Sequence, residues 1–198
     1  MSLELVNTFA TFGTFLVIAA TAIAALVQLR HARSSNQIAA LNELREANAS
    51  AQIQAARHFV RTELRERLTD PTFRHQMLNR RAMSAENQVA WNYILLVGNF
   101  YEGMGALVKS GLADRDLVLD SYYGQALSMW ELCAPITAIL RRQEGIGLWE
   151  NFEYLTVLSQ DWEAAHPQGT YPPGTRRIGL EDEWLEADKR YAASLAPA

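Results

Sequence analysis

The chain has 198 residues and a single cysteine, and its charges are distributed unevenly. Residues 30–81 contain ten Arg and five acidic residues, whereas residues 82–198 contain eight basic and sixteen acidic residues. An acidic main body argues against nucleic acid as a partner, because phosphate binding needs clustered Lys and Arg. The lone Cys133 excludes an intrachain disulfide and a cysteine-based zinc site, and it fits a reducing compartment.

The first predicted element is a membrane-spanning helix over residues 5–29. This run of 25 residues contains no charged residue. With about 1.5 Å of rise per residue it reaches about 37 Å, which exceeds the roughly 30 Å of a bilayer's hydrocarbon core. The alternatives are a buried core helix and a signal peptide cleaved near Ala22-Ile23-Ala24. Both are less favoured, because the run is too long for either and no Lys or Arg precedes it.

The charges that flank the apolar run predict its orientation. Only Glu4 is charged before the run, whereas Arg30, His31 and Arg33 follow it directly. Because cytoplasmic flanks carry an excess of Lys and Arg, we predict that residues 1–4 form a short extracytoplasmic tail of an inner-membrane protein and that the C-terminal domain lies in the cytoplasm. The three basic residues are then candidate membrane-interface residues, and the lipid bilayer is the first predicted partner.

Small residues recur within the run at spacings that can place them on one helix face, namely at Ala10, Gly13, Ala20 and Ala24. Such a face lets a second helix approach closely, so self-association through the membrane is one hypothesis. The alternative is that Ala and Gly are simply common in membrane spans.

A long basic amphipathic helix is predicted over residues 30–69. The segment contains no Pro or Gly, and helix-forming residues dominate its composition. Its end is predicted at Thr69, because Asp70 suits the N-cap of a following helix and Pro71 suits the first helical position.

Residues 70–166 are predicted to form the core of a helical bundle. After a short helix, Ser84 is the expected N-cap of an apolar helix that ends near Lys109, with Gly111 at its C′ position. We predict that this helix is buried in the bundle and is not a second span, since Glu86 and Glu102 flank only about 15 uncharged residues.

Two more bundle helices are predicted before the C-terminal segment. Asp114 is expected to cap one that continues to Arg142, with a kink or a new helix start at Pro135. The next covers residues 148–165, where apolar residues recur on one face.

Residues 167–198 are predicted to form an irregular Pro- and Gly-rich loop and a short helix, with Trp184 and Tyr191 as candidate docking residues. No strand pattern occurs in the sequence. The predicted fold is therefore all-α, with an N-terminal transmembrane helix, a long juxtamembrane helix and a cytoplasmic antiparallel helical bundle.

Polar residues inside the apolar helices are the first candidates for a binding site. They are Asn99, Glu102, Glu131, Arg141, Arg142 and Glu153. Buried charges must be paired, so an interhelical network of Glu and Arg is the favoured interpretation. The alternative is a ligand pocket, because perturbed carboxylates also occur at binding sites.

Motifs for catalysis are weak or absent in the sequence. Glu163 and His166 have the Glu-x-x-His spacing of di-iron bundles, but only one copy occurs and no cofactor is predicted. Cys133 has no adjacent His, so core packing is its favoured role. In Gly103-Met104-Gly105, small residues are expected to allow close helix packing and not phosphate binding.

Aromatic and small residues recur in several short segments, namely Trp91-Asn92-Tyr93-Ile94-Leu95, Asn99-Phe100-Tyr101-Glu102 with the following Gly103 to Val108, the Gly111-Leu112 turn, Trp130-Glu131 and Trp149-Glu150-Asn151-Phe152. In these segments the chain resembles a bacterial domain-of-unknown-function family of single-span, all-helical proteins. The resemblance covers most of the chain. It implies a bacterial inner-membrane protein without an established activity, and it adds no catalytic residue.

These observations predict a protein that is not an enzyme. The favoured function is a membrane-anchored interaction or scaffold protein that binds a partner protein or a second copy of itself. One alternative is a membrane-tethered sensor or regulator that binds a small ligand or lipid in the bundle near Asn99, Glu102 and Arg141. The third hypothesis is a metal-dependent enzyme that uses Glu163 and His166.

Overall fold

The structure is a computed structural model that describes the backbone of residues 3–195 and the side chains of residues 12–81 and 83–195. Helices are its only regular elements over these residues, so the all-α prediction is confirmed. The helices are α1 (Leu3–Ala49), α2 (Ala51–Thr62), α3 (Leu64–Arg67), α4 (Pro71–Leu78), the 3₁₀ helix η1 (Arg80–Ala82), α5 (Ala85–Lys109), α6 (Arg115–Glu144), α7 (Glu150–Ala165) and α8 (Leu185–Ser194). The chain divides into two units, and the boundary between them in the sequence lies between Pro167 and Gln168.

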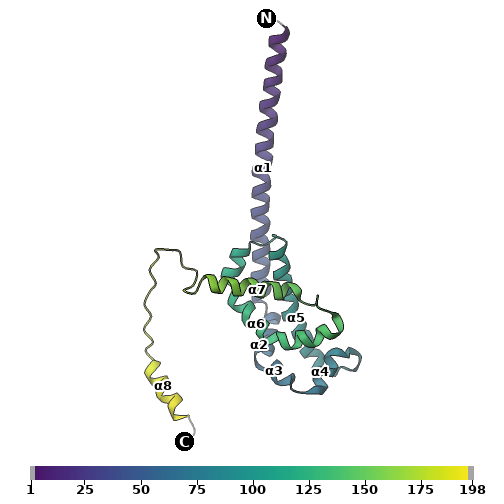
Figure 1. Cartoon of the computed structure of the whole chain (residues 1–198), viewed down its shortest axis with the longest axis vertical. Coiled ribbons are helices and arrows are strands. Elements are labelled where there is room, and N and C mark those ends of the chain that lie inside the picture. The colour runs from purple at the N-terminus through teal and green to yellow at the C-terminus, as the bar shows by residue number, and fades with distance from the viewer. Residues whose placement is uncertain (1–2, 196–198) are drawn as a thin grey trace. The chain divides into compact units, whose positions relative to one another are not determined.

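Helix α1 joins the apolar run to the bundle without a break. Figure 1 shows its N-terminal part extending beyond the other helices of its unit. Its large apolar side chains from Phe12 to Leu29 are exposed, and within the described residues it is the one helix that is long and apolar enough to span a membrane. Because these apolar side chains are not buried within the described part of the chain, the buried-core alternative is wrong.

The predicted single helix over residues 30–69 is not observed. Helix α1 ends at Ala49, and Ser50 adopts an extended conformation with φ −63° and ψ 141°. The Ser50 hydroxyl accepts a hydrogen bond from the Ile53 amide at 3.3 Å, so it caps α2. A second break at Glu63 separates α2 from α3. Of the predicted tail over residues 1–4, Leu3 and Glu4 belong to α1, and residues 1 and 2 lie outside the described residues.

The other predicted helix boundaries agree better with the structure. The side chains of Asp70, Ser84 and Asp114 each accept a backbone amide hydrogen bond at the start of α4, α5 and α6. Gly111 has φ +71°, and the turn that follows α5 forms a Schellman motif. Pro135 lies inside α6, so of the two predictions at that position a new helix start is wrong.

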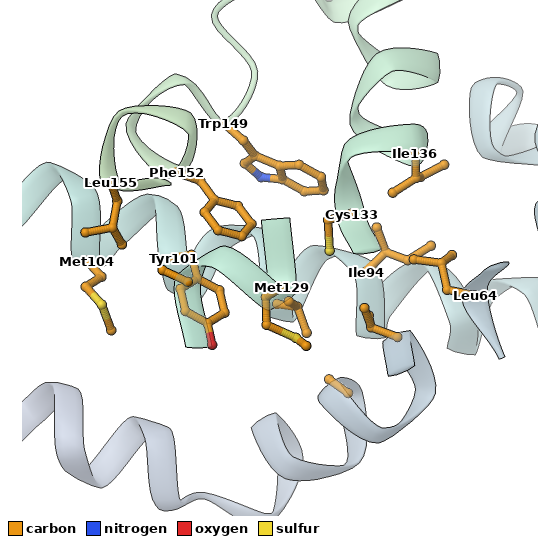
Figure 2. Packing of buried hydrophobic residues seen from close by; sticks show 14 of the residues in the cluster. Leu64, Ile94, Tyr101, Met104, Met129, Cys133, Ile136, Trp149, Phe152 and Leu155 are labelled. Atoms are coloured by element: carbon orange, nitrogen blue, oxygen red, sulfur yellow. The ribbon is translucent and has the colours of Figure 1, made fainter. Parts of the chain in front are cut away.

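Helices α5, α6 and α7 form the centre of the bundle, and α2 packs on α5. Aromatic rings lie at their junction (Figure 2). The ring centroid of Phe152 lies 4.8 Å from that of Tyr101 in a stacked arrangement and 5.0 Å from that of Trp130 in an edge-to-face arrangement. Nine residues of α5 are buried, so the prediction of a buried core helix is confirmed.

The C-terminal unit contains an irregular segment followed by α8. None of the residues of α8 is buried, and the predicted docking residues Trp184 and Tyr191 are exposed. A cation–π contact places the Arg177 guanidinium 4.5 Å from the centroid of the Tyr171 ring. This unit therefore has no apolar core among its described residues.

Candidate functional site

The carboxylate of Glu102, which belongs to α5, lies at the N-terminus of α7. Its Oε2 atom accepts hydrogen bonds from the backbone amides of Asn151 and Phe152, both at 2.9 Å. Its Oε1 atom accepts a third from Asn151 Nδ2 at 2.7 Å. The first amides of a helix have no partner within the helix and carry a partial positive charge. Glu102 therefore acts as an N-cap supplied by another helix, and both of its carboxylate oxygens accept hydrogen bonds within the protein.

Trp149 precedes α7 in a left-handed conformation, with φ 54° and ψ 38°. This conformation is costly for a bulky residue and persists only where the surroundings enforce it. Here the side chain is 2% exposed, and its Nε1 atom donates a hydrogen bond to Asn99 Oδ1 at 3.1 Å. Asn99 and Glu102 thus hold the start of α7 on one face of α5.

Close approach at this joint depends on two glycines of α5. A Cβ atom at Gly98 would lie 2.1 Å from the Trp149 ring, and a Cβ atom at Gly105 would lie 2.0 Å from the Asn151 carbonyl oxygen. Nothing lies within 4 Å of a Cβ atom at Gly103. The expectation of close helix packing at Gly103-Met104-Gly105 therefore holds for Gly105.

Arg141 connects α6 to the end of the α6–α7 turn and to the first turn of α7. Its Nε atom donates a hydrogen bond to the Leu148 carbonyl at 3.0 Å, and its Nη2 atom lies 2.7 Å from Glu153 Oε2. The guanidinium also lies 5.8 Å from the centroid of the Trp130 ring. The expected interhelical pairing of Glu and Arg is present here, whereas Arg142 is exposed.

Glu131 lies apart from the other candidates, in a groove between α6 and α7. The groove has a volume of about 530 Å³, and its lining includes Glu131, Glu163 and Trp130.

His166, the second residue of the candidate metal pair, contacts Trp162. Its Nδ1 atom lies 2.8 Å from the Trp162 carbonyl oxygen, and the centroids of the His166 and Trp162 rings are 4.2 Å apart. In the described part of the chain, no group of three or more potential ligands could hold a metal ion.

Sequence reasoning missed Arg57, which is only 3% exposed. Its guanidinium lies 5.2 Å from the centroid of the Phe100 ring and donates a hydrogen bond to Asn48. Among the described residues it forms no ion pair. Arg57 follows Ile53 by four residues and precedes Val60 by three, so its position on the apolar face of α2 was the available signal.

The bundle core shifts the titration of two buried groups. Burial raises the pKa of Tyr101 to about 12, although the nearby positive charges of Arg57 and Arg61 act in the opposite direction. Burial also raises the pKa of the Cys133 thiol to about 12. Cys133 is fully buried and packs among apolar residues, as Figure 2 shows, which agrees with the expected packing role.

This burial gives a measurable expectation for the single cysteine. Native full-length protein at pH 8 should react with iodoacetamide far more slowly than unfolded protein, because on the order of one Cys133 thiol in 10⁴ would be ionised. Mass spectrometry with and without denaturant measures the ratio. Equal rates in the two conditions would show that the core described around Cys133 is not closed.

An apolar groove crosses the surface where α1 ends and α2 and α5 meet. Its volume is about 560 Å³, and its lining consists of Ala47, Ile53, Asn92, Leu95, Leu96, Asn99 and Phe100. The side chains of Leu95, Leu96 and Phe100 are only partly buried. No local pattern in the sequence indicates this groove, because its walls come from three helices.

The fold and these contacts define a class of protein: an all-helical bundle on a long N-terminal helix whose apolar part is exposed. The chain belongs to the family described as "Domain of unknown function (DUF4760)", whose model matches residues 15–159. This confirms the expected membership of a domain-of-unknown-function family. No curated protein and no solved structure matches the chain in the other two comparisons.

Proposed function

We propose that the protein is a single-pass inner-membrane protein whose cytoplasmic helical bundle is an interaction module that associates with a second copy of the chain. The observation that carries the proposal is the distribution of polar and apolar groups. The polar candidates of the α5–α7 joint bind within the chain, whereas apolar surface stays exposed along α1 and in the groove on α5.

Membrane insertion is supported by the exposed side chains of α1. Phe15 is 64% exposed, Val17 67% and Leu29 66%, and an apolar surface of this length is unfavourable in water. The family match begins at residue 15, so it includes most of the apolar run along with the bundle. The apolar helix is thus part of the shared domain. The 25-residue length of the apolar run and the lack of Lys or Arg before it favour an anchor over a cleaved signal peptide.

The proposed orientation depends on the charges next to the apolar run. Arg30, His31 and Arg33 follow the run, and this excess of positive charge favours the cytoplasmic side. The bundle follows these residues, so the same rule places it in the cytoplasm.

Self-association is supported by the way in which a membrane orients and concentrates two anchored copies of the chain. Anchored copies have the same orientation, so their grooves lie at the same height, and confinement raises their effective concentration. A twofold interface would then place one groove against the other. Leu95, Leu96 and Phe100 supply apolar contact, while the Asn92 amide offers hydrogen-bonding groups at the rim.

Photocross-linking in bacterial membranes tests this proposal. A photoreactive amino acid at Leu96, in the groove, should give a cross-linked homodimer of the full-length protein. The same amino acid at Val157, an exposed position on α7, is the matched control and should give none. A monomer only, or an adduct with a different protein, would contradict self-association through the groove.

The sensor hypothesis has less support from the geometry. Asn99, Glu102, Arg141 and Glu153 would have to give up contacts within the chain before they could bind a ligand. The enzyme hypothesis would need further metal ligands beside Glu163 and His166.

A further inference from the structure

A second hollow lies where α1 leaves the bundle. It has a volume of about 380 Å³ and is formed by one face of α1 and the turn between α5 and α6. Its lining consists of Leu29, Ala32, Arg33, Asn36, Gln37, Ser110, Gly111 and Leu112. No contact described for the α5–α7 joint or for the α5 groove involves these residues.

The position of the hollow along α1 places it next to the end of the apolar run. Leu29 is the last residue of the uncharged run, and Arg33 follows it by four residues. With a rise of about 1.5 Å per residue, Arg33 lies about 6 Å beyond the end of the run. The headgroup layer on each side of a bilayer is about 5–8 Å thick. When the run ends at the edge of the hydrocarbon core, Arg33 is therefore at the level of the lipid phosphates.

The chemistry of the lining changes along the same direction. Leu29 forms an apolar wall at the end nearer the membrane, and the half-exposed Leu112 adds apolar surface from the α5–α6 turn. Arg33 is the one charged residue in the lining, and it forms no ion pair in the part of the chain that the structure describes. The side-chain amides of Asn36 and Gln37 add hydrogen-bond donors beyond it. This order matches a lipid, with acyl chains on the apolar side and a phosphate beside the cation.

The α5–α6 turn closes the hollow from the side of the bundle. Gly111 has φ +71°, and a Cβ atom there would lie 3.7 Å from Arg33 Nη2, so the guanidinium lies directly beside the turn. The Schellman motif holds the turn by two hydrogen bonds, from the Gly111 amide to the Val108 carbonyl at 3.1 Å and from the Leu112 amide to the Leu107 carbonyl at 3.0 Å. The hollow is thus formed by two ordered elements.

We propose that this hollow binds one anionic glycerophospholipid of the cytoplasmic leaflet, with its phosphate on Arg33. A bound lipid would link α1 to the α5–α6 turn and would hold the bundle close to the membrane surface. The inference rests on the proposed membrane placement of α1, but not on self-association.

Native mass spectrometry of the full-length protein tests this inference. The protein is inserted into nanodiscs of equal parts phosphatidylglycerol and phosphatidylcholine, and the lipids that remain bound after release are counted. Wild type should retain one phosphatidylglycerol in preference to phosphatidylcholine. Arg33→Gln should lower this preference about fivefold, as expected for the loss of one cation at a headgroup.

Arg30→Gln is the matched control, because Arg30 flanks the same apolar run and does not line the hollow. It should change the preference less than twofold. Equal losses in the two variants would overturn the site in favour of general attraction to the membrane. Protection of Cys133 from iodoacetamide verifies that each variant is folded.

Two further measurements distinguish failure of the membrane placement from failure of the lipid site, and a lipid from a free anion as the ligand. If full-length protein fails to float with liposomes, the membrane placement is wrong, whereas flotation without lipid preference overturns only the lipid site. Glycerol phosphate is added to protein in an uncharged detergent as the soluble probe. Binding that depends on Arg33 there, without lipid preference in nanodiscs, would assign the hollow to a free anion and overturn the proposal.

Discussion

Replacement of Gly105 by alanine should destabilise the bundle by about 3 kcal/mol or more, whereas replacement of Gly103 should not destabilise it. The methyl group at Gly105 would lie 2.0 Å from the backbone carbonyl oxygen of Asn151 and 2.6 Å from its carbonyl carbon. A flexible side chain could move away, but the first turn of α7 is held by Glu102. The helix α7 would therefore have to shift away from α5.

Gly103→Ala is the matched control because it makes the same chemical change two residues earlier in α5. Nothing lies within 4 Å of its new methyl group, so the intrinsic preference of Ala for helices should stabilise the protein by about 0.5–1 kcal/mol. Denaturant unfolding of the full-length protein in a mild detergent, followed by Cys133 labelling, measures both variants. Similar unfolding midpoints would contradict the close contact between α5 and α7.

Loss of the Glu102 carboxylate should have the second large effect. Glu102→Ala leaves the amides of Asn151 and Phe152 without their acceptor at a part-buried helix terminus. Hydrogen bonds to a charged group contribute about 1.5–3 kcal/mol each, but the amides can recover part of this by binding water. We expect a loss of about 2–4 kcal/mol in the free energy of unfolding.

Glu102→Gln and Glu131→Ala make this test specific. The glutamine keeps one acceptor oxygen, so it should recover part of the lost free energy of unfolding. The recovery should be incomplete, because an NH₂ group stands where the carboxylate had its second acceptor. Glu131 is exposed, so its replacement should change the free energy of unfolding by less than about 0.5 kcal/mol. An equal effect of Glu102→Ala and Glu131→Ala would contradict the capping role.

Local sequence signals predicted the features that depend on neighbouring residues. The caps at Asp70, Ser84 and Asp114 and the glycine at Gly111 follow from interactions within a few residues. The break at Ser50 has the same physical origin, because a serine side chain can bond a backbone amide three residues later. It was missed because the helix-forming residues on both sides indicated a continuous helix.

Tertiary contacts explain why the candidate site was predicted only in part. Asn99 and Glu102 were recognised as polar residues in an apolar helix, but their partners Trp149 and Asn151 are about 50 residues away. The sequence favoured an Arg as the partner of each buried Glu. Glu102 instead meets the backbone amides of a helix start, and these donors have no signature in the sequence.

The most direct test of the proposed function is native mass spectrometry of the full-length protein extracted gently from bacterial membranes. We expect the protein in the membrane fraction as a homodimer without a stoichiometric second protein. The mass of any retained lipid is subtracted before the number of protein copies is assigned. A monomer in the soluble fraction would contradict the membrane anchor. A membrane-bound monomer, or a complex with a different protein, would contradict self-association while leaving the anchor in place.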